Sequence, residues 1–185
     1  NAYLVTTNAA GWASFCAAEN TSLSGEAKTY VCTGVDNNIV TLEPVTHIPA
    51  NEGVFIKGEP NATYQIVPAE TGDAVSINLI KGCLTATTLA GTEGAYILGV
   101  KNGEAGIYQV TSSITVPAGK AYLQPATTGL AKFLSIAFPG STTAIEGIEA
   151  DGKTSSANKK YNLAGQRTES KQGIIIMDGK KYIIK

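Results

Sequence analysis

Hydrophobic and polar residues alternate along most of the chain in short runs, which Gly, Asn, Asp and Pro separate. This pattern predicts many short β-strands joined by tight turns. Thr, Val, Ile and Tyr fill the runs and fit a pleated, half-buried surface. No window shows a sustained helical period, and the best helical segment, 15–23, would form two turns at most. The predicted strands are 2–6, 11–16, 29–33, 39–42, 53–57, 63–67, 75–79, 95–100, 106–110, 120–124 and 132–138.

Two hairpins are the clearest local features. Asn102-Gly103 lies between the apolar runs 96–100 and 107–110, and Asp178-Gly179 lies between 174–177 and 182–184. Both dipeptides tolerate the positive φ angles of a type I′ turn. The sequence therefore predicts an antiparallel strand pair around each dipeptide.

A weak internal repeat supports a duplicated architecture. Residues 2–5 resemble 95–98, and residues 48–56 resemble 116–123, where a Pro-Ala dipeptide precedes each strand. A duplication would make one copy of 1–67 and another of 94–138, forming two similar sheets or half-barrels packed face to face. The expected fold class is all-β, a β-sandwich or barrel with an internal duplication.

The texture of the chain changes after Phe138. We predict a core domain at 1–139 and, at 140–185, a linker with a small β tail: a linker at 139–143, a short strand at 144–150, a polar loop at 151–158 and the final hairpin. That hairpin is apolar on both faces, so other strands or a neighbour should cover it. Lys180, Lys181 and Lys185 would keep its edge from pairing with other chains.

Composition and charge narrow the possible partners. The chain has 185 residues, 43% hydrophobic and 16% charged, with a net charge of -1. Arg167 is the only arginine, so no basic stripe exists to bind nucleic acid. The apolar runs are too short to span a bilayer. Asn1 follows no basic-then-apolar leader, so we expect any signal peptide to have been removed or to lie outside the sequence.

Three scattered cysteines leave two interpretations open. Cys16 and Cys32 could form a disulfide, which would leave Cys83 unpaired. Alternatively, all three are small buried thiols, which the odd count favours. No Cys-x-x-Cys spacing indicates zinc binding or thiol redox chemistry.

Candidate catalytic chemistry is sparse. His47 is the only histidine, no Gly-x-Ser-x-Gly segment presents a serine to it, and zinc would need ligands from distant segments. The carboxylates that a glycosidase could use lie mostly in turns. Asp36-Asn37-Asn38 and Asp151-Gly152 do not match a calcium loop, and no phosphate-binding loop is present. We therefore expect no catalytic residue, metal or cofactor. The carboxylates are Glu43, Glu52, Glu59, Glu70, Asp73, Glu93, Glu104, Glu146 and Glu149.

Aromatic side chains are the remaining binding resource. Trp12 and the tyrosines of the predicted strands could offer flat faces to sugar rings, with a polar tip at the surface. Most should lie in the core, because half the positions of a strand point inward. Trp12, which follows Gly11, is the candidate for partial exposure and hence for ligand binding.

The C-terminal motif is the most distinctive part of the sequence. Tyr161-Asn162-Leu163-x-Gly165-Gln166-Arg167, followed by Gly173-Ile174-x-Ile176-x-x-Gly179-Lys180-Lys181 and a basic last residue, resembles the tails of many secreted and surface proteins of Bacteroides and Prevotella. It also resembles a shortened type IX secretion sorting domain, and the segment 143–148 before it fits the same tails. The stretch from 11 to 53 resembles the β-rich modules that often precede them.

This resemblance implies a secreted, outer-membrane or cell-surface protein, and it transfers no catalytic residue. The expected function is a non-catalytic binding or adhesion module for an unidentified protein or glycan. A structural or sorting module of a larger surface assembly is the alternative. A carboxylate-dependent glycoside hydrolase accessory is a third reading. Neither nucleic acid nor a membrane span is expected.

Overall fold

The computed structural model describes residues 2–101, 104–138, 173–177 and 180–184. All of the regular structure in these residues is β, which confirms the all-β prediction. Within the same ranges no helix is long and apolar enough to cross a membrane. The chain divides into two compact units, Asn1–Ala144 and Ile145–Lys185.

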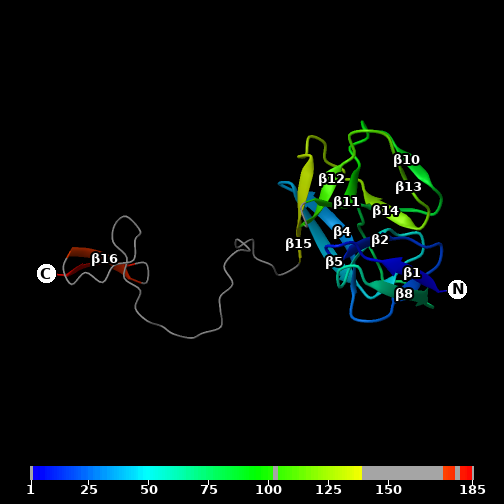
Figure 1. Ribbon diagram of the computed structural model, residues 1–185, viewed down its shortest axis with the longest axis horizontal. Helices are drawn as coiled ribbons and strands as arrows, with labels where there is room; N and C mark the ends of the chain where they lie inside the picture. The colour runs from blue at the N-terminus through cyan, green and yellow to red at the C-terminus, as the bar shows by residue number, and fades with distance from the viewer. Residues whose placement is uncertain (1, 102–103, 139–172, 178–179, 185) are drawn as a thin grey trace. The chain divides into compact units, whose positions relative to one another are not determined.

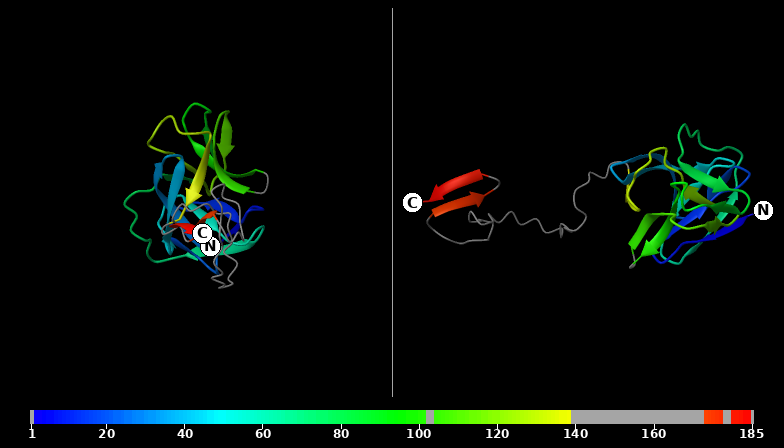
Figure 2. Two further views of the ribbon diagram at one scale, coloured as in Figure 1. Left: turned by 90° about the vertical axis from the view of Figure 1, so that its left-hand side faces the viewer. Right: turned by 90° about the horizontal axis from the view of Figure 1, so that it is seen from above.

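The first unit is built around a nine-stranded sheet that curls into a nearly closed barrel (Figure 1 and Figure 2). The strand order is β2-β7-β4-β5-β15-β12-β11-β14-β9. All neighbours are antiparallel except β5 and β15, which are parallel. The strands are β2 (Trp12–Phe15), β4 (Lys28–Asp36), β5 (Ile39–Val45), β7 (Val54–Lys57), β9 (Ile80–Cys83), β11 (Tyr96–Lys101), β12 (Glu104–Gln109), β14 (Lys120–Leu123) and β15 (Phe133–Ala137).

Two smaller sheets accompany the barrel. A four-stranded sheet contains β1 (Tyr3–Thr6), β8 (Thr63–Pro68), β3 (Thr21–Leu23) and β6 (His47–Ile48), in that order, and a two-stranded sheet contains β10 (Thr87–Leu89) and β13 (Ile114–Val116). Each contributes to its own apolar cluster with residues of the barrel strands. The largest cluster is built mainly from the barrel strands and includes Leu42, Phe55, Tyr96, Ile107, Leu123 and Leu134.

The barrel closes through a few specific contacts rather than a full ladder. Ala121 N–H donates to Ser14 Oγ (3.2 Å), and Cys16 N–H donates to the Gly119 carbonyl (3.1 Å), which joins the end of β2 to β14. A Cβ on Gly82 would lie 2.2 Å from Cys16 Sγ. Glycine at position 82 therefore lets β2 approach β9 closely.

Asn78 links three further segments at the same closure. Its Oδ1 accepts hydrogen bonds from the backbone N–H groups of Cys32 (3.2 Å) and Ile80 (3.0 Å). Its Nδ2 donates to Glu52 Oε2 and to the Gly53 carbonyl, both at 2.8 Å. Two donors and two acceptor positions are the full capacity of a carboxamide, so Asn78 is saturated.

The strand order of the barrel is the same from either end. From the outside inward, the two halves run β2-β7-β4-β5 and β9-β14-β11-β12, with β15 between them. If the four strands of each half are numbered in their order along the chain, they lie in the sheet in the order first, fourth, second, third. The short pairs β3–β6 and β10–β13 occupy corresponding places along the chain.

The turns before β7 and β14 also agree. Glu52 N–H donates to the Pro49 carbonyl, and Lys120 N–H donates to the Pro117 carbonyl, both at 3.3 Å. The third turn residue has a positive φ in each, 67° at Asn51 and 77° at Gly119. Both are therefore turns of type II geometry.

Most predicted strands have counterparts in the structure, and β11–β12 and β16–β17 confirm both hairpins, although their turn dipeptides lie outside the described residues. The strand at 75–79 is wrong, because Asn78 bonds there through its side chain instead of a ladder. The helical segment 15–23 is also wrong, because it contains the end of β2 and all of β3. The predicted repeat matched residues 2–5 with residues 95–98, but the structure places these segments in different sheets, in β1 and β11. Five short strands were not predicted: β3, β6, β9, β10 and β13.

The second unit contains the antiparallel pair β16 (Gly173–Met177) and β17 (Lys180–Ile184). Its register places Ile174 opposite Ile183 and Ile175 opposite Tyr182. The predicted linker at 139–143, strand at 144–150, loop at 151–158 and motif at 161–167 lie outside the described residues.

Asn78→Ala should destabilise the first unit by about 2–4 kcal/mol, because it leaves the N–H groups of Cys32 and Ile80 without their acceptor. Urea unfolding followed by Trp12 fluorescence measures this loss. Gln65→Ala, which removes an exposed amide from β8, is the matched control and should change the free energy of unfolding by less than about 0.5 kcal/mol. Equal stabilities for the two variants would contradict the role of Asn78.

Candidate functional site

Trp12 is buried, so the expectation that it is partly exposed is wrong, and with it goes the reason for choosing it as a ligand-binding candidate. It is 5% exposed and stacks on Phe138, with ring centroids 5.9 Å apart. Lys57 Nζ lies 5.6 Å from the centroid of the indole and donates to the Ala10 carbonyl (2.8 Å). The residue belongs to the barrel core because the turn at Gly11 directs it inward beside β7.

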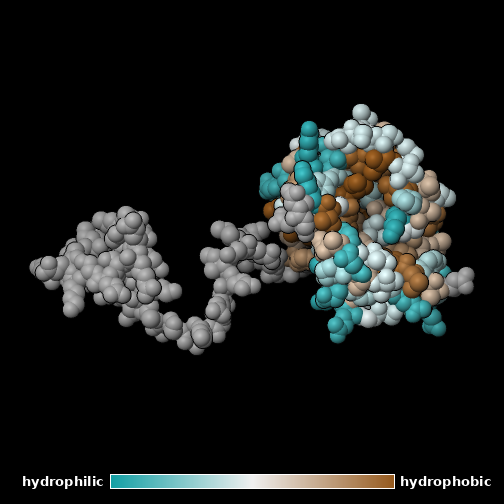
Figure 3. Space-filling model, viewed as in Figure 1, coloured by the Kyte–Doolittle hydropathy of each residue, from teal (hydrophilic) through white to brown (hydrophobic). Residues whose placement is uncertain are grey.

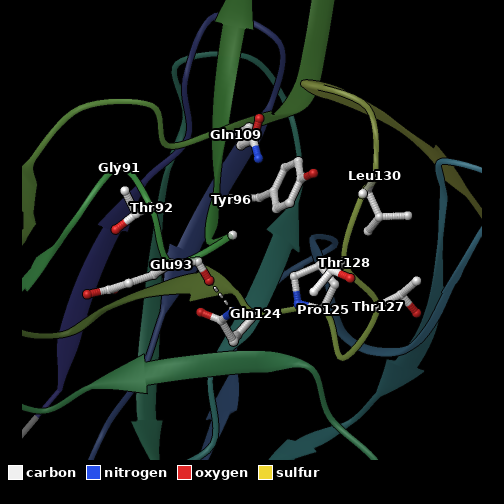
Figure 4. Close-up of a pocket in the computed structure, with 12 residues that line it drawn as sticks. Gly91, Thr92, Glu93, Tyr96, Gln109, Gln124, Pro125, Thr127, Thr128 and Leu130 are labelled. Atoms are coloured by element: carbon white, nitrogen blue, oxygen red, sulfur yellow. Dashed lines mark hydrogen bonds between the residues drawn. The ribbon is translucent and has the colours of Figure 1, made fainter.

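A polar pocket lies beside β11 and β12 in the barrel unit (Figure 4). Its volume is about 280 Å³. One wall is the loop at 91–94, the opposite wall is the loop at 124–130, and the Tyr96 ring lies between them. It is lined by Gly91, Thr92, Glu93, Gly94, Tyr96, Gln109, Gln124, Pro125, Thr127, Thr128, Gly129 and Leu130.

Two half-buried carboxamides face this pocket from different strands. Gln124, just after β14, donates through Nε2 to the Glu93 carbonyl (3.0 Å) and so connects the two walls. Gln109, at the end of β12, uses its backbone N–H for the Lys132 carbonyl. Its side-chain amide has no hydrogen-bond partner among the described residues, so it is available to a ligand.

Tyr96 gives the pocket a fixed aromatic wall. Its ring is 2% exposed, and its hydroxyl donates to the Ala131 carbonyl (2.9 Å), which holds the loop before β15. Asn38 Oδ1 accepts from Ala131 N–H (2.7 Å) and fixes the same loop from the other side. Burial raises the pKa of Tyr96, so its hydroxyl is a neutral donor. These bonds shape one wall before any ligand arrives.

A different cavity, of about 240 Å³, is lined in part by two carboxylates, those of Glu43 and Asp73. Asp73 Oδ2 accepts from the backbone N–H groups of Thr46 (2.6 Å) and His47 (3.2 Å), and Oδ1 lies 3.3 Å from His47 Nδ1. The Thr46 N–H bond is the largest influence and, with the His47 contacts, lowers the pKa of Asp73 against a smaller effect of burial. A glycosidase proton donor needs a raised pKa, so Asp73 is unsuited to that role.

The cysteines are separate buried thiols, which confirms the second interpretation and makes the Cys16–Cys32 disulfide wrong. Burial raises the pKa of Cys16 and of Cys32 to about 11. Both are therefore protonated at neutral pH, which makes them poor nucleophiles and poor metal ligands. Among the described residues no three His, Cys, Asp or Glu side chains gather as a metal site.

Sequence reasoning missed the pocket residues Gln109 and Gln124. A usable signal existed, since Gln109 and Gln124 each follow a short run of mainly apolar residues, 105–108 and 121–123, and a Thr-containing loop comes after each. On the face drawn in Figure 3, apolar and polar surface alternate in small patches without one broad apolar area. The polar pocket is therefore the best-formed candidate site.

No protein-family model, curated protein or solved structure matches the chain.

Asp73→Asn should destabilise the first unit at neutral pH. A carboxylate whose folded pKa is lowered stabilises the protein above its unfolded pKa of about 3.9, and this contribution is lost as the pH falls through the folded value. Urea unfolding of both proteins at about pH 7 and at about pH 3 measures the difference, which should shrink at the lower pH. A difference that is constant with pH would contradict this role, and Glu70→Gln on the exposed loop is the control.

Proposed function

We propose that the first unit is a non-catalytic binding module and that its polar pocket holds a neutral, hydroxyl-bearing ligand, a single sugar residue of a glycan. The observation that carries this proposal is the free carboxamide of Gln109, which faces the same cavity as Gln124 and the ring of Tyr96. A carboxamide can donate to one hydroxyl and accept from another, which is the pairing that sugars require.

The composition of the pocket supports a neutral ligand. Of the described residues, neither a lysine nor an arginine lines it, and Glu93 is the one carboxylate that does. An anion would meet no cation there. The volume of about 280 Å³ lies at the lower end of ligand pockets, for which about 300–1,000 Å³ is typical, and so favours a small ring over a larger molecule.

An internal duplication is part of the proposal. The matching strand order of the two halves of the barrel and the matching turns at Pro49 and Pro117 support it. On this basis β2 corresponds to β9, β4 to β11, β5 to β12 and β7 to β14. The first copy would begin near β2, later than the residue 1 predicted from the sequence, and the second would begin near β9, earlier than the predicted residue 94.

Export to the cell surface or medium is also proposed. Its support is the resemblance of 161–185 to sorting tails together with the pair β16–β17, whose sequence is mostly apolar. An isolated two-stranded hairpin is only marginally stable in water, so it is suited to recognition by a second protein. A structural or sorting role of the tail fits this part of the proposal.

Neutral sugars should bind the pocket, and Gln109→Ala should weaken the binding about fivefold to tenfold, because one or two hydrogen bonds are lost. Titration of the ¹⁵N-labelled chain with methyl glycosides of galactose, glucose, mannose and N-acetylglucosamine, followed by backbone amide shifts near Tyr96 and Gln124, measures the affinity.

The double variant Gln109→Ala/Gln124→Ala should abolish these shifts, while Gln65→Ala, the exposed amide of β8, should leave them unchanged. If none of the four sugars perturbs the pocket, or if the double variant binds as the unaltered chain does, the sugar proposal is wrong.

Removal of residues 145–185 should keep the protein inside the cell envelope of a bacterium that carries type IX secretion. Immunoblots of medium, surface and periplasmic fractions measure this, with the unaltered chain and the Lys81→Gln variant as controls. Equal export of the shortened chain would rule out a sorting role for the tail.

A further inference from the structure

Each half of the barrel has a cavity beside the same pair of corresponding strands. In the second half, Tyr96 of β11 lies directly opposite Gln109 of β12, and both line the polar pocket. In the first half, Tyr30 of β4 lies directly opposite Pro44 of β5. These two residues line another cavity, of about 370 Å³, together with Lys28 and Phe138. The two cavities therefore occupy the same position in the two halves.

Strand β15 relates the two cavities. The chain passes Leu130 of the polar pocket before it enters β15, and it passes Phe138 of the second cavity after it leaves. Strand β15 is antiparallel to β12 and parallel to β5. The last residues of β12 therefore lie beside the start of β15, whereas the last residues of β5 lie beside its end. The second cavity is thus the counterpart of the polar pocket at the other end of β15.

The chemistry of the second cavity differs from that of the first. Its walls are the rings of Tyr30 and Phe138, whose centroids are 5.2 Å apart, and the exposed ring of Pro44. Among the described residues that line it there is neither a carboxamide nor a carboxylate. Phe138 also stacks on Trp12, so the apolar wall is anchored in the core.

Lysines supply its charge. Lys28 is exposed and has no ion pair among the described residues, and the ladder places it directly opposite Lys57. Like charges at directly opposed positions destabilise a strand pair. Lys57 Nζ is directed to the Ala10 carbonyl and the Trp12 ring, so of these two lysines only Lys28 lines the cavity.

We infer that this cavity is a second ligand site and that it binds an acidic sugar residue, a hexuronate. The C–H face of the ring packs on the aromatic wall, and the carboxylate pairs with Lys28. This inference rests on the proposed sugar-binding function, and it assigns the two halves to different ligands, neutral beside Gln109 and anionic beside Lys28.

Titration of the ¹⁵N-labelled full chain with methyl galacturonoside and with methyl galactoside tests the assignment. The uronate should shift the backbone amides of Lys28, Tyr30 and Val45, and the neutral sugar should not. Lys28→Gln should weaken uronate binding about fivefold, whereas Lys81→Gln, an exposed lysine of β9, should have no effect. Raising the salt from about 0.01 M to about 0.15 M should weaken it as well, because the Debye length falls from about 30 Å to about 8 Å.

Phe138→Leu keeps an apolar side chain but removes the ring, so it should weaken uronate binding without unfolding the unit, which urea unfolding verifies. The inference is overturned if the uronate shifts only residues of the polar pocket, if galactoside shifts Lys28 equally, or if Lys28→Gln and Lys81→Gln behave alike. The Gln109→Ala/Gln124→Ala variant separates the two proposals. Uronate shifts at Lys28 should survive in it, even if no neutral sugar binds the unaltered chain.

Discussion

The side chain of Asn78 is the constraint on which the closed barrel depends. A curled sheet must satisfy the backbone groups at its ends, and an edge left open can pair with other chains. In this protein no continuous ladder joins the two ends: a single bridge pairs Glu52 with Lys81 of β9, and Leu79 N–H donates to the Cys32 carbonyl of β4. Asn78 replaces the ladder, accepting from Cys32 and Ile80 and donating to Gly53 and Glu52. Its amide holds together segments that are distant in the sequence.

The sequence predicted the features that depend on local pattern. Alternation over four or more residues predicted every barrel strand except β9, and the Asn-Gly and Asp-Gly dipeptides predicted the hairpins. It missed β3, β6, β10 and β13, because a strand of two or three residues is too short for a period to show. It also failed at Asn78, whose apolar neighbours are typical of a strand, because three of its four hydrogen-bond partners, Cys32, Glu52 and Gly53, are distant in the sequence. The pocket was hidden for the same reason, as Gln109 and Gln124 meet only through the fold.

The two halves of the barrel have the same residue type at a corresponding buried position and different residue types at a corresponding position on the rim of a cavity. Tyr30 and Tyr96 both point inward, 8% and 2% exposed, in the same cluster. The residues opposite them, Pro44 and Gln109, have different chemistry although they hold the same ladder position. A buried ring is constrained by packing on every side, so its replacement is costly. A residue at the rim of a cavity has no such packing constraint, so its chemistry can differ between the two halves.

The modest size of both cavities bears on how such a module would work. A site that offers one or two amides, or a single ammonium beside an aromatic wall, can bind one sugar residue only weakly, because association entropy offsets most of the contact energy. The two proposed sites on one barrel would change this limit. Once one site is occupied, the other meets its ligand at a high effective concentration if the ligand is displayed repeatedly on a surface or polymer. Weak, unlike pockets at the two ends of β15 therefore suit adhesion to a dense, mixed glycan better than capture of a free sugar, and this agrees with the surface location proposed from the C-terminal tail.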